Sequence, residues 1–438
     1  MNARPGDRLR VFFDRESLGE LERRGPSRYR FQYAPGAVDR YGVGKVVLSA
    51  SLPVQSDAFV PSRSAPFFEG LLPEGSVRAS IANSFHLSEE DGFGLLDALG
   101  ADCAGAVTVL PPGSEPAFPT GRRKLLDVGA LGRLIEELPR NPLGVSSSSD
   151  GVRLSLGGLQ HKLVLCGENE LVGSMGGKIL TGLSQPLEGA PSTCLVKPEF
   201  GQYGGLVLNE YFCMRVAGSL GLEVADIDFL VSAVPVPSLF VERYDRTTIN
   251  GLVRRLHQED MCQALGVLPA AKYEVNGGPS VAAIVGLLRR LGGSRMARDI
   301  NDFIHAVLIN FLLGNSDAHG KNFALLYEES GVRLAPLYDV VSSAVYPDIT
   351  DRMAMKIGGI DDPEEVDMAA WGRLAEECEL GGGIAPLVRR RAKAALKAAE
   401  IWRTDPWVGA QKSLALHRDV LDAIVDVCRR RTMQLIES

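Results

Sequence analysis

Residues Gly314–Phe323 read GNSDAHGKNF and directly follow the apolar run Ile304–Leu313. Within six positions this stretch places a carboxylate, an imidazole, an ammonium and an amide. Asn, Ser, Asp and Gly are ordinary turn formers, which favours a surface turn. The spacing Asp317-x-x-x-x-Asn322 is also typical of a phosphotransferase loop, in which the aspartate holds a hydroxyl nucleophile and the asparagine holds Mg²⁺. Both interpretations are open from the stretch alone.

The overall composition is that of an ordinary globular protein. The 438 residues are 45% hydrophobic and 23% charged, which suits two or three domains with a sizeable core. A net charge of −7 gives no global basic field for nucleic acid or an anionic membrane. We find no secretory signal pattern and no apolar run of the ~18–20 residues that span a bilayer. Seven scattered cysteines without a metal-binding spacing predict reduced, structural thiols, so we expect a cytoplasmic protein with no membrane contact.

Changes in composition divide the chain into four expected segments. These are a β-rich module at 1–112, a linker with a short helix at 113–150, a strand-rich segment at 151–248 and a helical segment at 249–438. Gly42–Lys45 lacks the first glycine of a G-x-x-x-x-G-K phosphate loop and is interpreted as a hairpin turn. We expect no catalytic residue in the first segment.

Local patterns predict the individual elements of the first and last segments. The first segment is predicted to hold strands at Arg8–Phe13, Val46–Ser49 and Thr108–Leu110, a turn at Pro35-Gly36, and helices at Val77–His86 and Ser88–Leu99. Helical spacing in the last segment covers Gln258–Leu265, Pro279–Leu291, Ala297–Leu313, Leu387–Arg403 and Leu414–Arg431. The basic clusters Arg389–Arg391 and Arg429–Arg431 are interpreted as solvated helix faces, with a nucleic-acid or acidic-partner contact as the alternative.

The strand-rich segment carries further candidate residues. Gly157-Gly158 lies between two apolar stretches, either as a simple hairpin or as a loop whose N–H groups reach a phosphate. Lys197 ends an apolar strand, where it is either solvated or paired with nucleotide phosphates. Glu210 begins a predicted helix, where it suits the helix dipole or anchors a phosphate-binding lysine. Glu242–Arg246 follows a core strand, a place where backbone groups can read an adenine edge.

A second aspartate completes an order of elements that is typical of kinases. Asp339 lies in an apolar run, where a lone carboxylate is costly unless it is paired or bound to a metal. Phosphoryl transfer needs cations on the phosphates, a carboxylate near the acceptor hydroxyl, and metal ligands. On this interpretation Lys197 holds ATP phosphates and Asp317 orients and deprotonates the hydroxyl. Asn322 and Asp339 then hold Mg²⁺, which prefers oxygen ligands.

Eight stretches together resemble the HipA-type serine/threonine protein kinases, the toxins of bacterial HipBA toxin–antitoxin systems. They are Phe67–Gly75, Arg153–Lys162, Val196–Pro198, Asn209–Tyr211, Val241–Arg246, Leu256–Gln263, Asn315–Phe323 and Leu337–Val340. The Gln258–Gln263 block, combined with the Asp-x-His-x-x-Asn loop, is the specific part of the resemblance. It implies an α+β, two-lobed, protein-kinase-like fold with a small β-rich N-terminal module and an all-helical C-terminal lobe.

The resemblance also implies roles for single residues. Asp317 would be the catalytic base, Lys197 the nucleotide lysine supported by Glu210, and Asn322 and Asp339 the Mg²⁺ ligands. Further nucleotide contacts would come from the phosphate loop Gly157, Gly158, Leu159, Gln160, His161 and Lys162, from the hinge Glu242, Arg243 and Tyr244, and from His319 and Lys321, which would otherwise shape the catalytic loop.

Ser155 matches the serine that these kinases autophosphorylate. Autophosphorylation adds nearly two negative charges beside the ATP phosphates and would inactivate the enzyme. Gly157-Gly158 and His161 replace the more usual Ala-Gly and Glu of the family's phosphate loop, which could tune ATP affinity or target choice.

Known members of the family phosphorylate aminoacyl-tRNA synthetases, notably glutamyl-tRNA synthetase. Their helix-turn-helix antitoxin, HipB, binds both the toxin and the operator DNA. The resemblance therefore implies an ATP- and Mg²⁺-dependent kinase that arrests growth, with a HipB-like partner and an indirect link to DNA. Two alternatives stay open: a small-molecule kinase, and a non-catalytic partner of a DNA-binding repressor.

Overall fold

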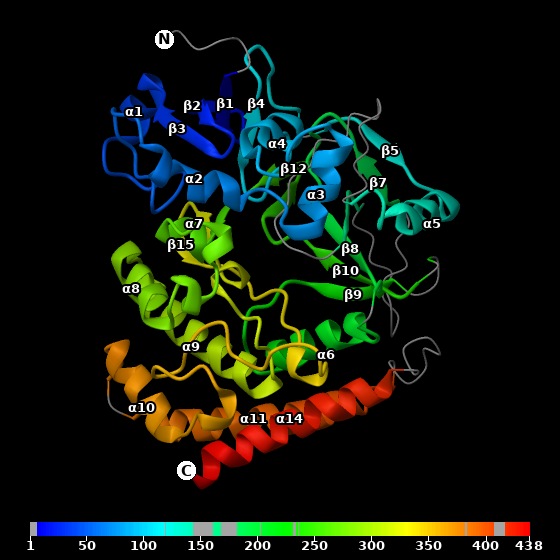
Figure 1. Cartoon of the computed structure of the whole chain (residues 1–438), viewed down its shortest axis with the longest axis vertical. Coiled ribbons are helices and arrows are strands. Elements are labelled where there is room, and N and C mark those ends of the chain that lie inside the picture. The colour runs from blue at the N-terminus through cyan, green and yellow to red at the C-terminus, as the bar shows by residue number, and fades with distance from the viewer. Residues whose placement is uncertain are drawn as a thin grey trace.

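The computed structural model describes residues 7–118, 120–142, 161–167, 182–201, 203–230, 234, 236–381, 383–406 and 417–438. Small antiparallel sheets and helices form three successive layers along the long axis of the molecule (Figure 1). The N-terminal module and the strand-rich part lie next to each other toward one end, the buried helices lie in the middle, and two long C-terminal helices lie at the other end. This arrangement confirms the expected α+β fold class.

The N-terminal module, residues 8–110, is a four-stranded sheet with order β3-β2-β1-β4 and four helices. Its elements are β1 (Arg8–Phe13), β2 (Glu16–Gly25), β3 (Arg28–Tyr33), α1 (Pro35–Tyr41), α2 (Pro61–Gly70), α3 (Gly75–Ser84), α4 (Gly92–Leu99) and β4 (Val107–Leu110). Two predictions were wrong. Pro35 starts a helix because proline suits the first helical turn, and Val46–Ser49 supplies only an isolated bridge from Ser49 to Leu52.

The strand-rich part forms the smaller lobe of the main body. Its central sheet has the order β6-β8-β10-β9, and two helices and two two-stranded sheets, β11-β12 and β5-β7, accompany it. The elements are β5 (Arg123–Leu125), α5 (Val128–Glu137), β6 (Leu163–Leu165), β7 (Ser184–Pro186), β8 (Cys194–Pro198), α6 (Leu206–Ser219), β9 (Ile227–Leu230), β10 (Ser238–Glu242), β11 (Arg246–Ile249) and β12 (Leu252–Arg255). The predicted strand that ends in Lys197 is confirmed, and it pairs with β10 so that Lys197 lies opposite Leu239.

The larger lobe is mainly helical but includes a three-stranded sheet, which corrects the expectation of an all-helical lobe. Its elements are β13 (His257–Asp260), α7 (Met261–Leu265), α8 (Val281–Leu291), α9 (Met296–Leu313), β14 (Ala324–Glu328), β15 (Gly331–Leu334), α10 (Met368–Glu377), α11 (Ile384–Arg403) and α14 (Arg418–Glu437). Short 3-10 turns occupy Pro269–Ala271, Glu274–Asn276, Gly320–Asn322, Ser343–Val345 and Pro363–Glu365.

The predicted helix Gln258–Leu265 is half strand. Asp260 caps the first turn of α7 by accepting from the backbone N–H of Gln263, and the Gln263 side chain accepts from the N–H of Asp260 in return. This capping box satisfies two backbone groups at the helix start. The helix therefore begins at Met261, and the residues before it are available to pair with β14.

Helix α9 is the buried axis of the larger lobe and delivers the loop that follows it. It ends at Gly314, whose φ of +80° is a left-handed conformation that glycine adopts without strain. Arg431 of α14 is almost fully buried and donates to the carbonyl of Phe311 at 2.5 Å. The interpretation of Arg429–Arg431 as a solvated face is therefore wrong for Arg431, which ties α14 to the end of α9. Helices α11 and α14 run side by side (Figure 1).

A buried ion cluster joins the N-terminal module to the smaller lobe. Asp102 of the module accepts from Arg246 at 3.0 Å and from Arg255 at 3.1 Å. Arg243 pairs with Asp245 at 2.8 Å, and Asp245 also accepts from the backbone N–H of Gly105 in the module at 2.7 Å. Burial raises the pKa of Asp102, and the surrounding guanidinium groups reverse this so that its pKa is lowered. Because unpaired buried charges are costly, the cluster fixes the module against the lobe.

All seven cysteines are buried and carry free thiols, as predicted. Across the part of the chain that the structure describes, every helix is too short or too polar to cross a bilayer.

Candidate active site

A cavity of about 910 Å³ lies between the two lobes, within the range of sizes typical of small-molecule sites. Its walls come from β8, α6, the residues after β10, the loop after α9 and the segment around Asp339. Gly70 and Glu74 of the N-terminal module also reach it. The module, in which we expect no catalytic residue, therefore still forms part of the cavity wall.

Strand and helix periodicity place the first two charged groups in the cavity. Leu195 and Lys197 are two residues apart on β8 and so share one face of the sheet. Leu206, Glu210 and Met214 are four residues apart on α6 and so share one face of that helix. The two faces meet, and the Lys197 Nζ lies 2.7 Å from a Glu210 carboxylate oxygen.

Lys197 also forms an ion pair with Asp339, the second aspartate of the kinase-like order. Its Nζ lies 2.7 Å from Asp339 Oδ1, so one ammonium joins two carboxylates. Burial alone would lower the pKa of Lys197, and the carboxylates of Asp339 and then Glu210 reverse this, so the pKa is raised. The Lys197 ammonium in turn lowers the pKa of Asp339 to about 2. Burial raises the pKa of Glu210, and Lys197 offsets part of the rise.

Asp339 is held in an uncommon backbone conformation. Its φ is +61°, a left-handed value that costs free energy for a residue with a side chain. The segment that follows is fixed by Asn209, whose amide donates to the carbonyl of Ser342 at 2.9 Å and accepts from its N–H at 2.8 Å. The turn aims the Asp339 side chain into the cavity, where it keeps 44% of its exposure.

Asn322 and Asp339, the two predicted Mg²⁺ ligands, lie next to each other. Asn322 Nδ2 donates to Asp339 Oδ2 at 3.3 Å. Asn322 Oδ1 is buried and has no hydrogen-bond partner among the described residues. An acceptor oxygen left in this state is costly unless a donor or a cation completes it. One amide oxygen and one ionised carboxylate are the donor types that Mg²⁺ prefers, so the residues present fit this ion.

Asp317 stands at the opening of the cavity with 52% of its side chain exposed. The hydroxyl of Tyr273 donates to Asp317 Oδ1 at 2.6 Å. Its backbone N–H is held by the side chain of Asn315 at 3.1 Å. Burial raises the pKa of Asp317, and the hydrogen bond from Tyr273 acts in the opposite direction. The geometry leaves the second carboxylate oxygen available to an incoming hydroxyl.

His319 and Lys321 are two further residues of the loop that carries Asp317, and both contact charged side chains. Burial lowers the pKa of His319 to about 3, so the imidazole is neutral near pH 7, and its Nε2 lies 4.0 Å from Asp317 Oδ1. Lys321 pairs with Asp260 at 2.7 Å and with Glu74 at 3.6 Å. Both side chains line the cavity, and their predicted contact with phosphate oxygens stays a prediction.

Only part of the predicted phosphate loop belongs to the described residues. Ser155 and Gly157, Gly158, Leu159 and Gln160 lie outside them. His161 and Lys162 line the cavity. Burial, together with the nearby Lys197 ammonium, lowers the pKa of Lys162 to about 8.

The predicted hinge, Glu242–Tyr244, lines the cavity, and its residues form hydrogen bonds with other parts of the protein. The Arg243 backbone N–H donates to Thr193 at 2.9 Å, and its guanidinium belongs to the buried ion cluster. The Tyr244 hydroxyl donates to Gln258 at 2.6 Å. Glu242 donates its backbone N–H to Asp226 at 2.8 Å.

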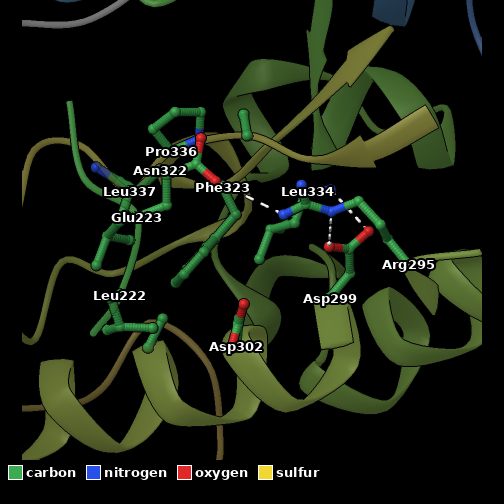
Figure 2. Close-up of a pocket in the computed structure, with 12 residues that line it drawn as sticks. Leu222, Glu223, Arg295, Asp299, Asp302, Asn322, Phe323, Leu334, Pro336 and Leu337 are labelled. Atoms are coloured by element: carbon green, nitrogen blue, oxygen red, sulfur yellow. Dashed lines mark hydrogen bonds and ion pairs between the residues drawn. The ribbon is translucent and has the colours of Figure 1, made fainter. Parts of the chain in front are cut away.

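A second, much smaller pocket is lined in part by Asn322 and Phe323, at the end of the same loop (Figure 2). Asp299 is one of the residues that line it, and it accepts from the backbone N–H of Leu334 at 3.2 Å and pairs with Arg295 at 3.7 Å. Its volume of about 20 Å³ suits a single water molecule. The large cavity is therefore the candidate active site.

Four site residues escaped the sequence reasoning: Tyr273, Lys272, Glu74 and Asp260. Glu74 and Asp260 lie in stretches that resemble the family, which was the only signal for them. Tyr273 contacts Asp317 across 44 positions of sequence, so no local pattern could have indicated the contact.

The two lobes, the lysine bonded to a helix glutamate, and the Asp…Asn loop define the class as a protein-kinase-like fold with a phosphotransferase type of site. The HipA-like C-terminal domain family matches residues 154–403, and the HipA N-terminal domain family matches residues 9–110. The chain belongs to the HipA family of kinases.

Named relatives agree with this assignment. The putative kinase Y4mE of Sinorhizobium fredii is 39% identical over 87% of this chain and 88% of its own length. The serine/threonine-protein kinase toxin HipA of Shewanella oneidensis is 32% identical over 73% of this chain and 72% of its own length. A chain in the solved complex of HipA, HipB and operator DNA from Shewanella oneidensis has a TM-score of 0.76 and 24% identity, covering 98% of this chain and 97% of that one. This likeness supports the fold.

Proposed function

We propose that this chain is an ATP- and Mg²⁺-dependent serine/threonine protein kinase that arrests growth as the toxin of a toxin–antitoxin pair. One observation carries the catalytic part: Lys197 bonds both Glu210 and Asp339 while Asp317 stands at the cavity opening. This arrangement supports the proposal, because phosphoryl transfer needs a cation for the phosphates and a carboxylate for the acceptor hydroxyl in one cleft.

Each group has a defined task in the reaction. The acceptor hydroxyl donates its proton to Asp317, and its oxygen forms a bond to the γ-phosphorus while the bond from that phosphorus to the β-γ bridging oxygen breaks. ADP leaves with the electron pair of that bond. Lys197 and Lys162 bind and orient the phosphates by charge, which restricts the approach to one direction.

Asn322 and Asp339 would hold Mg²⁺. When bound, this ion neutralises the charge that develops on the β- and γ-phosphate oxygens. The buried, unpartnered oxygen of Asn322 supports this assignment. Among the described residues there is no group of three or more His, Cys, Asp or Glu side chains suited to a metal, which agrees with an ion that takes most of its ligands from the nucleotide and water.

The substrate and partner follow from the family. We infer that the acceptor is an aminoacyl-tRNA synthetase, such as glutamyl-tRNA synthetase, and that the kinase also phosphorylates its own Ser155 to switch itself off. A HipB-like helix-turn-helix antitoxin would neutralise it and connect it to operator DNA. The named HipA kinase toxin and the solved complex of HipA with HipB and operator DNA support the partner, and the synthetase and Ser155 rest on the resemblance to the family alone. The site of action would be the cytoplasm.

The test combines labelled ATP with mass spectrometry. Wild-type protein and Asp317→Asn are each incubated with γ-labelled ATP, Mg²⁺ and purified synthetases, and phosphopeptides are mapped. We expect label on Ser155 and on one synthetase with wild type only, with loss of aminoacylation in step. Label on a sugar or an antibiotic and never on protein would replace the proposal with a small-molecule kinase. Growth arrest by Asp317→Asn equal to that of wild type would favour a non-catalytic partner.

A further inference from the structure

Tyr273 makes a short contact with the proposed base. Its hydroxyl lies 2.6 Å from Asp317 Oδ1, and its ring meets the His319 ring edge-on at 5.3 Å. In the described part of the chain, Tyr273 is the side chain that donates a hydrogen bond to this carboxylate. Tyr273 therefore fixes one oxygen of Asp317 and leaves the other oxygen for the acceptor.

Tyr273 itself is held by a network of backbone hydrogen bonds. Its carbonyl accepts from the N–H groups of Asn276 and Gly278, each at 2.9 Å. The next residue, Glu274, donates its N–H to Ala354 at 2.9 Å and accepts from the N–H of Lys356 at 2.7 Å. The tyrosine thus stands on a short, well-braced turn. Its ring position is set before any acceptor arrives.

The N-terminal module reaches this turn through one carboxylate. Glu74 lies just before α3 and pairs with Lys272 at 3.0 Å. Lys272 immediately precedes Tyr273 and lies 5.6 Å from its ring centre. Glu74 also lies 3.6 Å from Lys321 in the catalytic loop. The same carboxylate therefore contacts both the loop that carries Asp317 and the turn that carries Tyr273.

We propose that Tyr273 is a positioning residue for Asp317, and that Glu74 makes the N-terminal module part of the catalytic apparatus by holding both elements in register. This inference rests on the proposed function, because it assigns the contact a part in phosphoryl transfer. It gives a role to Glu74, the carboxylate of the N-terminal module that lines the cavity. It also provides a physical route by which a macromolecule bound to the module can change catalysis, since moving Glu74 would release Tyr273.

The experiment compares Tyr273→Phe and Glu74→Gln with matched controls in the full-length protein. Tyr41→Phe removes a hydroxyl outside the cavity, and Glu89→Gln removes an exposed charge from the same module. Phosphoryl transfer is measured under single-turnover conditions, and ATP binding is measured separately. We expect Tyr273→Phe to slow transfer about tenfold or more, since it removes a hydrogen bond to a charged group. ATP affinity should stay within about twofold, because Tyr273 contacts none of Lys162, Lys197 or Asp339. Glu74→Gln should slow transfer about threefold.

A second readout distinguishes positioning from a general loss of structure. The titration of Asp317 is followed by NMR with carboxyl-labelled aspartate. Losing the Tyr273 hydroxyl removes an interaction that lowers the pKa of Asp317, so the pKa should rise in Tyr273→Phe and stay unchanged in Tyr41→Phe. The charged and titratable groups that face Asp317 and remain in both variants are Lys272, His319, Glu74 and Asp339.

Each outcome decides one question. Wild-type transfer rate together with a wild-type Asp317 titration in Tyr273→Phe would overturn the inference. If Tyr273→Phe does not fold, the rate of Glu74→Gln against Glu89→Gln decides in its place. If wild-type protein transfers no phosphate to any protein, the proposed function fails, and the Asp317 titration alone then decides whether Tyr273 positions this carboxylate.

Discussion

Replacing Lys197 by methionine should destabilise the protein in a pH-dependent way. The substitution keeps the length of the side chain but removes an ammonium that lies 2.7 Å from both Glu210 and Asp339. Glu210 is 2% exposed, so it is left buried without its strongest partner, whereas the half-exposed Asp339 can be solvated. Breaking a buried pair by removing one member costs about 3–5 kcal/mol.

Protonation of Glu210 sets an upper limit on that cost. A carboxyl with the ordinary pKa of 4.5 is 2.5 pH units below pH 7. Protonating it at pH 7 therefore costs about 3.4 kcal/mol, at about 1.36 kcal/mol per unit. At pH 5.5 the same limit falls to about 1.4 kcal/mol. A carboxyl whose pKa is raised in the folded state contributes stability that is full below its unfolded pKa and is lost as the pH rises toward the folded pKa. The deficit of Lys197→Met should therefore grow from pH 5.5 to pH 7.

The assay is urea unfolding followed by circular dichroism at both pH values, with a double-mutant cycle. Adding Glu210→Gln to Lys197→Met removes the buried charge and should recover about 2–3 kcal/mol at pH 7. The control Arg8→Met breaks an exposed pair with Glu20 and should change stability by about 0.5 kcal/mol or less. The reasoning is refuted if Lys197→Met has the same deficit at both pH values, or if the double variant is no more stable than the single one.

Three further predictions concern the cleft and the catalytic loop. ATP phosphates should raise the pKa of Lys162 from about 8. Because this amine is about half protonated at pH 8, ATP binding at pH 8 should take up about half a proton in wild type and none at this position in Lys162→Met, as measured by calorimetry in buffers of different ionisation enthalpy. Asn322→Ala removes the unpartnered oxygen and should raise the Mg²⁺ concentration for half-maximal transfer about tenfold, while nucleotide binding without Mg²⁺ is unchanged. Gly314→Ala would place a Cβ 2.9 Å from Ala344 and Val427, in a backbone with a φ of +80°. This substitution should lower the free energy of unfolding by about 2–4 kcal/mol. The control Gly286→Ala has open space around its Cβ and should not lower the free energy of unfolding.

Helices α8 and α9 of the larger lobe were predictable, although α8 buries one stripe and α9 is buried on all sides from Phe303 to Leu313. Helices α8 and α9 follow the predicted ranges closely, since their apolar residues recur at helical spacing and face a single core. The chemistry of the loop after α9 was also visible, because the Asp…Asn spacing lies within one short stretch. Lys197, Glu210 and Asp339 come together as their order along the chain suggested.

The N-terminal sheet was harder to predict because its strands are charged. Strand β2 carries Glu20 and Glu22, which pair across the sheet with Arg8 and Arg30. Cross-strand ion pairs of this kind need the partner strand to be known first. Strand β13 was predicted as part of a helix for another reason. It buries Glu259, and a charged residue is not the pattern from which a buried strand is predicted. Tyr273 and Glu74 meet the loop only through the tertiary fold.

The central claim is that Asp317 receives the proton of an acceptor hydroxyl while Lys197 and Lys162 hold ATP. The most direct measurement is the single-turnover rate of phosphoryl transfer from ATP to protein, in wild type and in Asp317→Asn, with ATP affinity measured in parallel. We predict a fall of at least about a hundredfold in the rate of Asp317→Asn, with ATP affinity within about threefold of wild type. An Asp317→Asn protein that binds ATP normally and transfers phosphate at the wild-type rate would contradict the account.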